Sequence, residues 1–526
     1  MRAHVVCLPI AALIFGLSAC GSQNVSLDGF ESGGSVPGGV GPGTVGGGVG
    51  GANPSVTNAQ ASDLRMTQIA VYQTVEVMIM ENGSVTQNRQ APVVPNKDAI
   101  LRVFVTPSSG WQARPIIARL KARGDGAVLP PQEVKMTVNS ASSTESGGST
   151  FNFMIDGGSI TGDFTYSVEL LETSPQVMGT GDSSGAVWPA DGTFAPMAEE
   201  VGQKLEVVLV PVRYNADGSG RLPDVSDYQV QLYRTHFATL YPASDLQVSV
   251  RAAVDWNTEV EAFGSGWGEL LNGLQNLRYQ DRAEDHVYYY GLFSPENSFY
   301  DFCGRGCVAG LSSLVQDYRW ADARASIGLG YGGVDAADTM VHEIGHAHGR
   351  EHAPCGLGGQ SSDSRYPNGN ASLDVHGFDM RSTSLLTPSS YKDMMSYCDP
   401  LWVSAYTYNA LYQRMQNISY TSRIISAEDV EPEAEWATLL VLPEGEVEWG
   451  YPVGSRVAPD VETRPISLFD AEQNLVGKAE AYFMPFSHID GGTLVFPALD
   501  AEEVAYVEYG KHRLSVDAMP KAAFVE

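Results

Sequence analysis

The sequence predicts a multidomain fold in which an α/β domain, residues 203–425, is flanked by all-β domains at 62–195 and 426–526. Two patterns predict this arrangement. Strand-like and helix-like segments alternate in the middle of the chain, which is typical of a mixed, mainly parallel sheet, whereas only strand-like segments recur on either side. The chain has 526 residues, of which 43% are hydrophobic, so it can bury several cores.

Charge excludes some classes of partner. The formal net charge is −30, so the surface would repel a polyanion. We therefore expect no nucleic-acid partner, and no electrostatic docking on anionic lipid.

The flanking β domains are predicted from short apolar runs that end at turn residues. In the first, residues 69–80 lead into the turn Glu81-Asn82-Gly83, and residues 99–105 end at Pro107. Further runs and their spacing suggest a β-sandwich. In the C-terminal domain the clearest runs are 436–442, 493–496 and 504–509.

The central domain is predicted element by element. Its strands are expected at 205–214, 246–254, 286–293 and 325–331. Its helices are expected at 227–241, at 267–283 and from about Ala336, with Asp335 as the N-terminal cap of the last. Four strands alternating with helices favour parallel strand pairing.

The N-terminus is typical of an export signal. Arg2 precedes an apolar stretch, residues 5–17, which is too short to span a membrane. The sequence Leu17-Ser-Ala-Cys-Gly21 resembles a bacterial lipoprotein box, which implies removal of residues 1–19 and a lipid on Cys20. An ordinary signal peptide with an incidental cysteine is the alternative.

The rest of the N-terminal region is predicted to be a tether. Residues 20–60 are rich in glycine, with 11 glycines between positions 33 and 51. Gly21 is not Asp, which by analogy favours the outer membrane or cell surface of a bacterial envelope. No later segment is apolar for long enough to span a membrane, so we expect membrane attachment through the N-terminal lipid only.

Four cysteines remain after Cys7 and Cys20 are set aside. An even number in an exported chain favours disulfides. We favour Cys303–Cys307, which would close a small ring around Gly-Arg-Gly, and Cys355–Cys398. Zinc binding by the first pair is the alternative, as is zinc ligation by one cysteine of the second pair.

The most informative segment is residues 340–352, which carry four of the ten histidines. Three of the four form the pattern His-Glu-x-x-His-x-x-Gly-x-x-His, and the fourth is His348. On a helix, His342 and His346 are separated by about 400°, so their imidazoles lie one above the other and can share a metal ion. His348 lies about 200° from His346, so we exclude it as a ligand. Gly349 can adopt a positive φ and end the helix, which lets His352 approach the metal.

Three neutral imidazoles with an open fourth position predict a catalytic zinc site rather than a structural one. Zinc would lower the pKa of a bound water to about 7 and polarise a substrate carbonyl. Glu343 projects beside the metal, where a general base belongs, and could pass the proton to the leaving amine.

The segment resembles the extended zinc motif of the metzincin metalloproteases. That clan also has a methionine turn beneath the zinc, and Asp393-Met-Met-Ser-Tyr-Cys398 resembles it, which makes Met395 the floor residue. Tyr397 matches the position of a tyrosine that ligates the resting metal or holds the transition-state oxyanion in some members. A packed aromatic side chain is the alternative for Tyr397.

The resemblance covers residues 203–425 and implies a zinc-dependent endopeptidase. Residues 325–331 stand where metzincins have the edge strand, to which an extended peptide can add. Within the clan, several short segments resemble those of the secreted bacterial metalloproteases that are typified by mucin-cleaving, lipoprotein-like enzymes. The expected substrate is therefore an extracellular protein or glycoprotein. These segments are Arg89–Val94, Leu101–Val105, Tyr290–Leu292, Val308–Leu311, Gly377–Asp379 and Asp393–Cys398.

Two further expectations concern cofactors and function. Asp363, Asp374 and Asp379 could bind calcium, although solvated acidic loops are commoner. The remaining histidines are isolated in sequence and are expected in the core or on the surface: His236, His286, His376, His488 and His512.

The alternative function is a surface adhesion or binding lipoprotein built on a metzincin scaffold. We expect a monomer.

Overall fold

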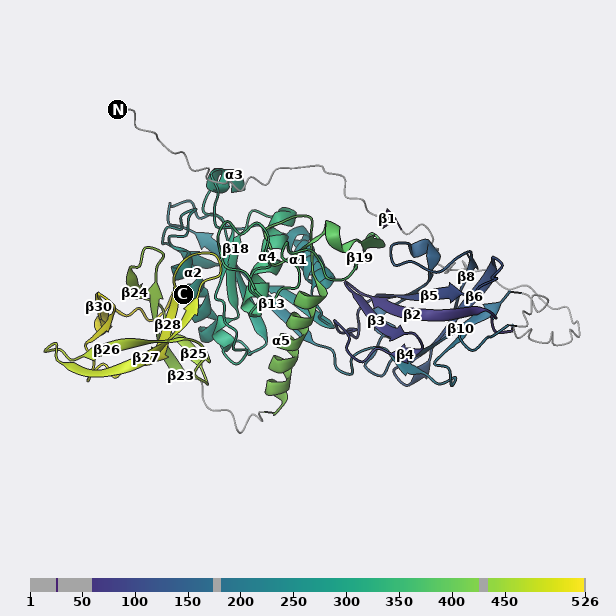
Figure 1. Cartoon of the computed structure of the whole chain (residues 1–526). Coiled ribbons are helices and arrows are strands. Elements are labelled where there is room, and N and C mark those ends of the chain that lie inside the picture. Colours follow the sequence, from purple (N-terminus) through teal and green to yellow (C-terminus); the bar gives the residue numbers. More distant parts are fainter. Residues whose placement is uncertain (1–24, 27–58, 174–180, 425–433, 525–526) are drawn as a thin grey trace, which may run out of the picture. The chain divides into compact units, whose positions relative to one another are not determined.

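A computed structural model describes residues 25–26, 59–173, 181–424 and 434–524. The signal peptide, Cys20 and nearly all of the tether lie outside these residues. The described chain is mostly β, with several sheets and few helices, and it divides into two compact units (Figure 1). We call residues 23–202 with 375–387 the N-terminal unit, and residues 203–374 with 388–526 the central unit.

The N-terminal unit contains two larger antiparallel sheets. One has the order β4-β3-β2-β5-β9, and the other the order β11-β10-β6-β7, with β8 also on β6 and β12 also on β10. Alternate residues of β6 are buried, as expected for strands with one covered face. The bounds are β2 Leu64–Tyr72, β3 Glu76–Glu81, β4 Ser84–Val85, β5 Ala99–Pro107, β6 Arg114–Gly124, β7 Ala127–Val128, β8 Gln132–Val138, β9 Phe151–Ile155, β10 Thr165–Glu172, β11 Val187–Trp188 and β12 Ala195–Pro196.

Smaller elements complete this unit. A three-stranded sheet has the order β1-β20-β19, and Phe378 and Leu385 from it pack against Tyr72 and Phe104. The bounds are β1 Val25–Ser26, β19 Gly377–Asp379, β20 Ser384–Leu386, and the 3₁₀ helices η1 Gly147–Ser149 and η2 Gly157–Ser159.

The sheet of the central unit has the order β14-β13-β16-β18-β17, with β15 also beside β13. All its pairs are parallel except β17 with β18. The bounds are β13 Lys204–Tyr214, β14 Asp245–Val250, β15 Val254–Trp256, β16 Val287–Phe293, β17 Gly310–Ser312 and β18 Ala325–Leu329. The expectation that residues 325–331 form the edge was wrong, because β18 lies between β16 and β17 and the short β17 is the edge strand.

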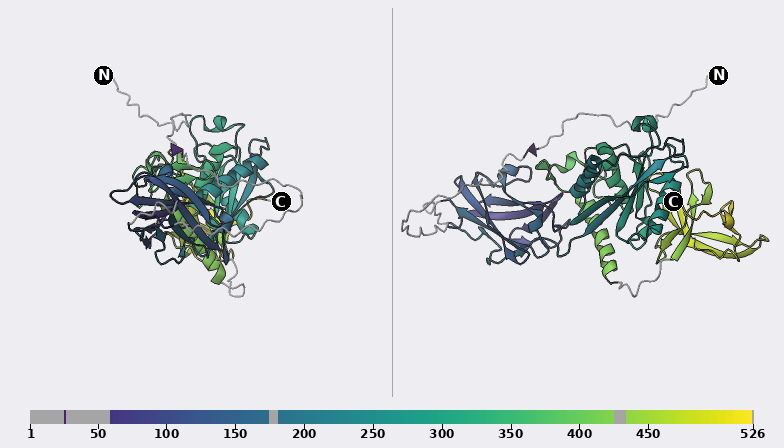
Figure 2. Two further views of the ribbon diagram at one scale, coloured as in Figure 1. Left: turned by 90° about the vertical axis from the view of Figure 1, so that its right-hand side faces the viewer. Right: turned by 180° about the vertical axis from the view of Figure 1, so that it is seen from behind.

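Helices cover both faces of this sheet (Figures 1 and 2). The strand period of two separates the faces of β16: Tyr289 packs in the core of α2, while Tyr288 stacks on His348 at the end of α4. The bounds are α1 Asp227–Leu240, α2 Trp267–Gln280, α3 Phe299–Cys303, η4 Ala321–Ala323, α4 Gly333–Ala347, β21 Lys392–Asp393, β22 Leu401–Trp402, η5 Pro388–Ser390 and α5 Ala405–Ile424.

The start of α4 differs from the expected Asp335 cap. Gly332 and Gly333 have φ of 81° and 85°, the helix begins three residues earlier, at Gly333, and Asp335 lies in its first turn. Gln229 of α1 supplies the polar partner, because its Oε1 accepts the Gly333 N–H at 2.8 Å. A side chain from a neighbouring helix therefore replaces the local cap.

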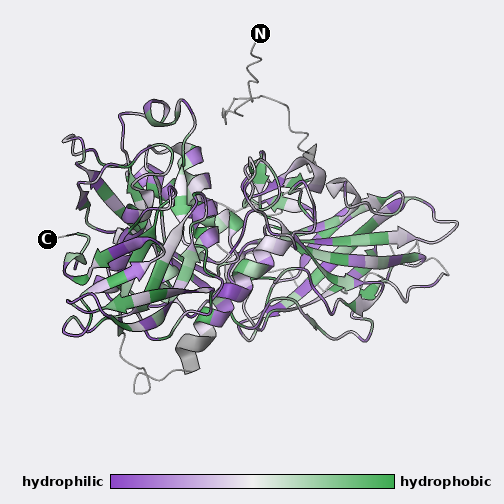
Figure 3. Cartoon of the chain, turned by 60° about the vertical axis from the view of Figure 1, so that its left-hand side comes forward, coloured by the Kyte–Doolittle hydropathy of each residue, from purple (hydrophilic) through white to green (hydrophobic). Residues whose placement is uncertain are grey.

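Residues 434–524 form an eight-stranded antiparallel sheet that belongs to the central unit. Helix α2 contacts both this sheet and the parallel sheet, and Asn272 and Asn276 donate to the carbonyls of Tyr451 and Pro452. The bounds are β23 Ala434–Val441, β24 Val447–Trp449, β25 Val453–Ser455, β26 Thr463–Phe469, β27 Leu475–Pro485, β28 Gly492–Pro497, β29 Tyr506–Tyr509, β30 His512–Ser515 and η6 Val516–Ala518. Hydrophobic and hydrophilic residues both occur along the strands (Figure 3).

Candidate metal centre

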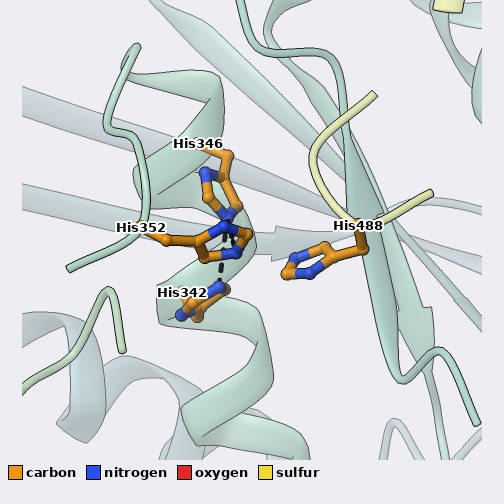
Figure 4. Close-up of side chains that lie close together, drawn as sticks. All are labelled: His342, His346, His352 and His488. Carbon is orange, nitrogen blue, oxygen red and sulfur yellow. Dashed lines mark hydrogen bonds between the residues drawn. The ribbon is translucent and has the colours of Figure 1, made fainter. Parts of the chain in front are cut away.

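Helix α4 presents two imidazoles one above the other. His342 and His346 are four residues apart, and their Nε2 atoms lie 3.0 Å from each other (Figure 4). Their side chains are almost fully buried. The helical spacing therefore brings these two nitrogens together, as the motif predicts.

Gly349 turns the chain back toward the same point. It has a φ of +79°, and His348 is the C-cap of α4. Beyond the turn, Nε2 of His352 lies 3.1 Å from Nε2 of His346. The side chain of His352 is buried and contacts the backbone of Ser361.

The protonation of these rings can be inferred from their outer nitrogens. Nδ1 of His342 lies 2.7 Å from the Met394 carbonyl, and Nδ1 of His346 lies 2.6 Å from the Arg350 carbonyl. A carbonyl only accepts, so each Nδ1 carries the hydrogen and each Nε2 presents a lone pair. Burial reinforces this neutral state, because it lowers the pKa of His342 to about 4 and that of His346 well below its usual value.

Lone pairs that face one another at 3.0 Å repel unless a cation lies between them. A tetrahedral zinc ion with Zn–N bonds of about 2.0–2.1 Å keeps its nitrogens about 3.3 Å apart. The separations of the His346 Nε2 from the Nε2 atoms of His342 and His352, 3.0 Å and 3.1 Å, are close to that value. The donor set and its tautomers therefore fit a zinc-like ion, and a metal resolves a repulsion that hydrogen bonding cannot.

Residues 393–398, the predicted methionine turn, contact helix α4 at Gly345 and His342. Met395 is 1% exposed, and a Cβ added to Gly345 would lie 2.4 Å from its Sδ, so the glycine permits this contact. Asp393 orients the turn by accepting the Met395 N–H at 2.8 Å. Met394, between them, provides the carbonyl that fixes the tautomer of His342.

Tyr397 reaches the cluster from the same turn. Its hydroxyl lies 3.2 Å from Nε2 of His352 and donates to Oε1 of Gln360 at 3.0 Å. Burial, helped by the charge of Glu343, raises the pKa of the phenol, so Tyr397 keeps its proton at neutral pH. A packed aromatic side chain would also have its hydroxyl satisfied, as this one is by Gln360, so the role of Tyr397 stays a prediction.

Glu343 lies beside the imidazoles and is 1% exposed. Its Oε2 accepts from the Ser312 hydroxyl at 3.1 Å, and the Ser487 hydroxyl is 3.5 Å away. The Glu343 carbonyl, 2.8 Å from the same hydroxyl, is a second acceptor for its single hydrogen. Edge strand β17 therefore holds this carboxylate in place.

His488 also belongs to the cluster, and its assignment as an isolated histidine was wrong. Ligand atoms of His342, His346, His352 and His488 all lie within 4.8 Å of one another (Figure 4). Nε2 of His488 is 2.6 Å from Oε1 of Glu343, a contact without hydrogen-bond alignment, and Nδ1 contacts the Tyr397 hydroxyl. No local sequence pattern marks His488, because it is brought in by the turn between β27 and β28.

The excluded histidine lies elsewhere. His348 stacks on Tyr288 with ring centroids 4.3 Å apart and an interplanar angle of 3°. Its Nδ1 contacts the Ile344 carbonyl at 2.8 Å. Burial lowers its pKa to about 3, as expected for a neutral core side chain.

The two favoured disulfides are formed. Cys303–Cys307 closes the short ring at the end of α3, and Cys355–Cys398 joins the segment after His352 to the end of the methionine turn. Because Tyr397 N donates to the Cys355 carbonyl, the second bridge and a hydrogen bond connect the same two segments. No cysteine is left in this region to ligate a metal.

The acidic residues considered for calcium are used in other ways. Asp363 accepts from Arg350 and from the Tyr406 hydroxyl, while Asp374 accepts the N–H groups at the start of α5. Asp379 pairs with Arg381 in the N-terminal unit. Across residues 59–173, 181–424 and 434–524, the histidine cluster is the group that could hold a metal ion.

No protein-family model matches the chain, and no curated protein matches it. Among solved structures, metalloproteinase-II from Bacteroides fragilis is similar over 61% of this chain and 88% of its own, at 13% identity and a TM-score of 0.25. A TM-score this low does not establish a common fold. Within the described residues, no helix is long and apolar enough to cross a membrane.

Proposed function

We propose that this protein is a zinc-dependent endopeptidase of the metzincin type. The observation that carries the proposal is the convergence of three neutral imidazole Nε2 atoms, from His342, His346 and His352, beside the carboxylate of Glu343. The methionine turn beneath them, with Met395 against Gly345, adds support.

The proposed roles follow from position. A zinc ion held by the three imidazoles would act as a Lewis acid that polarises a peptide carbonyl and acidifies water. Glu343 accepts the proton of the attacking water and passes it to the leaving amine, while the Ser312 hydroxyl keeps the carboxylate oriented. Tyr397 keeps its proton and can donate a hydrogen bond to the developing oxyanion.

The substrate class follows from the sheet edge. Strand β17 is the outer strand beside the cluster, and Ser312 and Glu343 connect it directly to the site. An extended polypeptide can add to such an edge through main-chain hydrogen bonds. We therefore propose extended segments of extracellular proteins or glycoproteins as substrates.

The cellular setting remains as the sequence predicts it. We propose that Cys20 carries lipid, that the Gly-rich tether separates the folded units from the membrane, and that the protein is exposed at a bacterial envelope. Because the net charge of −30 would repel a polyanion, we propose no nucleic-acid partner. We also propose that the protein is a monomer.

One observation favours a second function, that of an adhesion or binding protein on the same scaffold. His488 stands beside the three imidazoles, and four protein ligands are typical of a structural zinc site rather than a catalytic one.

An assay of peptide-bond cleavage distinguishes the two proposed functions. The full-length protein in detergent, loaded with zinc, is incubated with an unfolded protein, with and without a chelator, beside His488→Ala and the double variant His488→Ala/Glu343→Gln. Chelator-sensitive cleavage that depends on Glu343 supports the peptidase. Absence of cleavage by the unaltered protein and by His488→Ala would support the binding protein.

A further inference from the structure

The turn between β27 and β28 lies along the edge strand of the parallel sheet. The Leu314 N–H donates to the Pro485 carbonyl and the Ser487 N–H to the Ser312 carbonyl, each at 2.9 Å. Ser313 and Phe486 form an antiparallel bridge between these bonds. We call residues 485–489 the plug segment.

The plug segment takes the hydrogen-bonding groups that an extended peptide would use. Besides the two main-chain bonds, the Ser312 N–H donates to the Ser487 hydroxyl at 3.0 Å. At the other end of β17, the Val308 N–H donates to the Ala262 carbonyl at 2.8 Å. The edge to which a substrate would add is therefore already paired on both sides of Gly310.

The pairing of Ser487 with β17 directs the following residue, His488, into the histidine cluster. The ring centroid of His488 lies 4.9 Å from that of His352, 5.0 Å from that of His346 and 5.2 Å from that of His342. Its Nε2 also lies 2.6 Å from Oε1 of Glu343. The imidazole of His488 thus lies beside the other three (Figure 4), and it contacts the proposed general base as well.

The plug segment is anchored on both sides of His488. Phe486 is buried against Gly268 of α2, and Ile489 packs over Gly264. Gln360, which also binds the Tyr397 hydroxyl, donates to the His488 carbonyl at 3.0 Å. These contacts hold the imidazole in place and lower the entropy lost when it binds a metal.

We propose that the plug segment is a built-in pseudosubstrate that keeps the protein latent: its backbone occupies the substrate strand position on β17, and His488 is the fourth ligand of the metal. The proposal rests on the peptidase function and names its regulation. Activity then requires the β27–β28 turn to be displaced or cut, which frees the strand edge, the metal position and Glu343 in one event.

The test uses the full-length protein loaded with Co(II), whose visible absorption reports its ligand number, and with azide as the added ligand. Unaltered protein should show a four-coordinate spectrum that azide does not change. His488→Ala should bind azide and bind zinc about 100-fold more weakly, because a ligand is lost. His512→Ala, on β30 of the same sheet, is the matched control and should behave like the unaltered protein.

A second variant tests the strand pairing. Ser487→Pro removes the N–H that pairs with Ser312 but keeps His488, so it should raise cleavage of an unfolded protein and leave an azide-sensitive fraction. His488→Ala should cleave at least about tenfold faster than the unaltered protein. The reason is that removal of the imidazole frees Glu343, and a general base contributes a factor of that size or more. Circular dichroism confirms that each variant is folded.

The outcomes distinguish the two proposals. If azide already changes the spectrum of the unaltered protein, and His488→Ala alters neither the spectrum nor the zinc affinity, the plug is refuted. A freely active unaltered protein with an unaffected His488→Ala variant refutes the plug but keeps the peptidase. An opened site in His488→Ala without any cleavage supports the fourth ligand and refutes the peptidase.

Discussion

Nε2 of His488 lies 2.6 Å from Oε1 of Glu343, although the two residues belong to a C-terminal turn and to the central helix α4. The contact places a fourth imidazole between the proposed base and the three expected ligands. It explains why the same cluster can be interpreted as a closed metal site or as a catalytic site held shut.

Glu343 should be needed for turnover but not for metal binding. In a His488→Ala background, Glu343→Gln should slow peptide cleavage by about 100-fold to 10,000-fold, because the amide cannot accept a proton. The zinc dissociation constant, measured by competition with a chromophoric chelator, should change little. A variant that keeps its cleavage rate would remove Glu343 from the mechanism.

Tyr397 should affect the rate more than metal affinity. Tyr397→Phe in the same background should lower kcat by about 100-fold to 1,000-fold while KM stays nearly constant, since the hydroxyl acts on the oxyanion. Burial keeps the phenol protonated, so the effect should persist across neutral pH. A large loss of zinc affinity instead would identify Tyr397 as a ligand.

Removal of the metal should destabilise the central unit. Without a cation, the Nε2 lone pairs of His342, His346 and His352 face one another in a buried space. Zinc at a thousand times its dissociation constant would stabilise the fold by about 4 kcal/mol. Calorimetry with and without a chelator should show a lower Tm, which zinc restores and calcium does not. An unchanged Tm would contradict a metal centre.

Loss of the Cys355–Cys398 bridge should lower the stability of the protein more than loss of the Cys303–Cys307 bridge. The Cys355–Cys398 bridge closes a loop of 43 residues between the third ligand and the methionine turn, so its loss should cost about 3–4 kcal/mol. Cys355→Ala/Cys398→Ala should lower both the Tm and the zinc affinity. The matched double variant at Cys303 and Cys307, separated by four positions, should lower the Tm about half as much, because the same relation gives about 2 kcal/mol for so short a loop. Equal effects of the two double variants would argue against this account.

A half-buried pair of acids, Glu269 of α2 and Glu448 of the C-terminal sheet, should make the stability of the protein depend on pH. Burial, with the nearby charge of Glu448, raises the pKa of Glu269 to about 7. The unfolded carboxyl loses its proton near pH 4.5, so the folded state binds the extra proton between these values and stability falls as pH rises through this window. Burial also raises the pKa of Glu448.

Replacing the acid should remove this dependence. Glu269→Gln should stabilise the protein above pH 7 by about 1–2 kcal/mol, less than the full shift implies because the carboxyl is partly solvated. Its stability between pH 4.5 and 7 should be flatter than that of the unaltered protein in urea unfolding. An identical pH profile for both proteins would show that Glu269 ionises freely.

Local patterns predicted the parts of the site that lie within one helix and its turn. The positions of His342, His346 and Glu343 follow from 3.6 residues per turn, and Gly349 supplies the positive φ that returns His352. The exclusion of His348 has the same basis. These are short-range constraints, so the order of residues is enough to specify them.

Other features needed contacts between distant segments. The cap of α4 comes from Gln229 on a neighbouring helix, which no local signal marks. The edge strand is β17 rather than β18, because a three-residue strand carries too little periodicity to be recognised.

The sequence by itself determined a cluster of three histidines with an adjacent carboxylate, because helix geometry aligns His342 with His346 and the turn at Gly349 brings back His352. Only the tertiary structure decided what stands opposite that motif. His488 reaches it because the β27–β28 turn pairs with Ser312 and Leu314 at the edge of another sheet, and such pairing depends on backbone N–H and C=O groups that all residues but proline share.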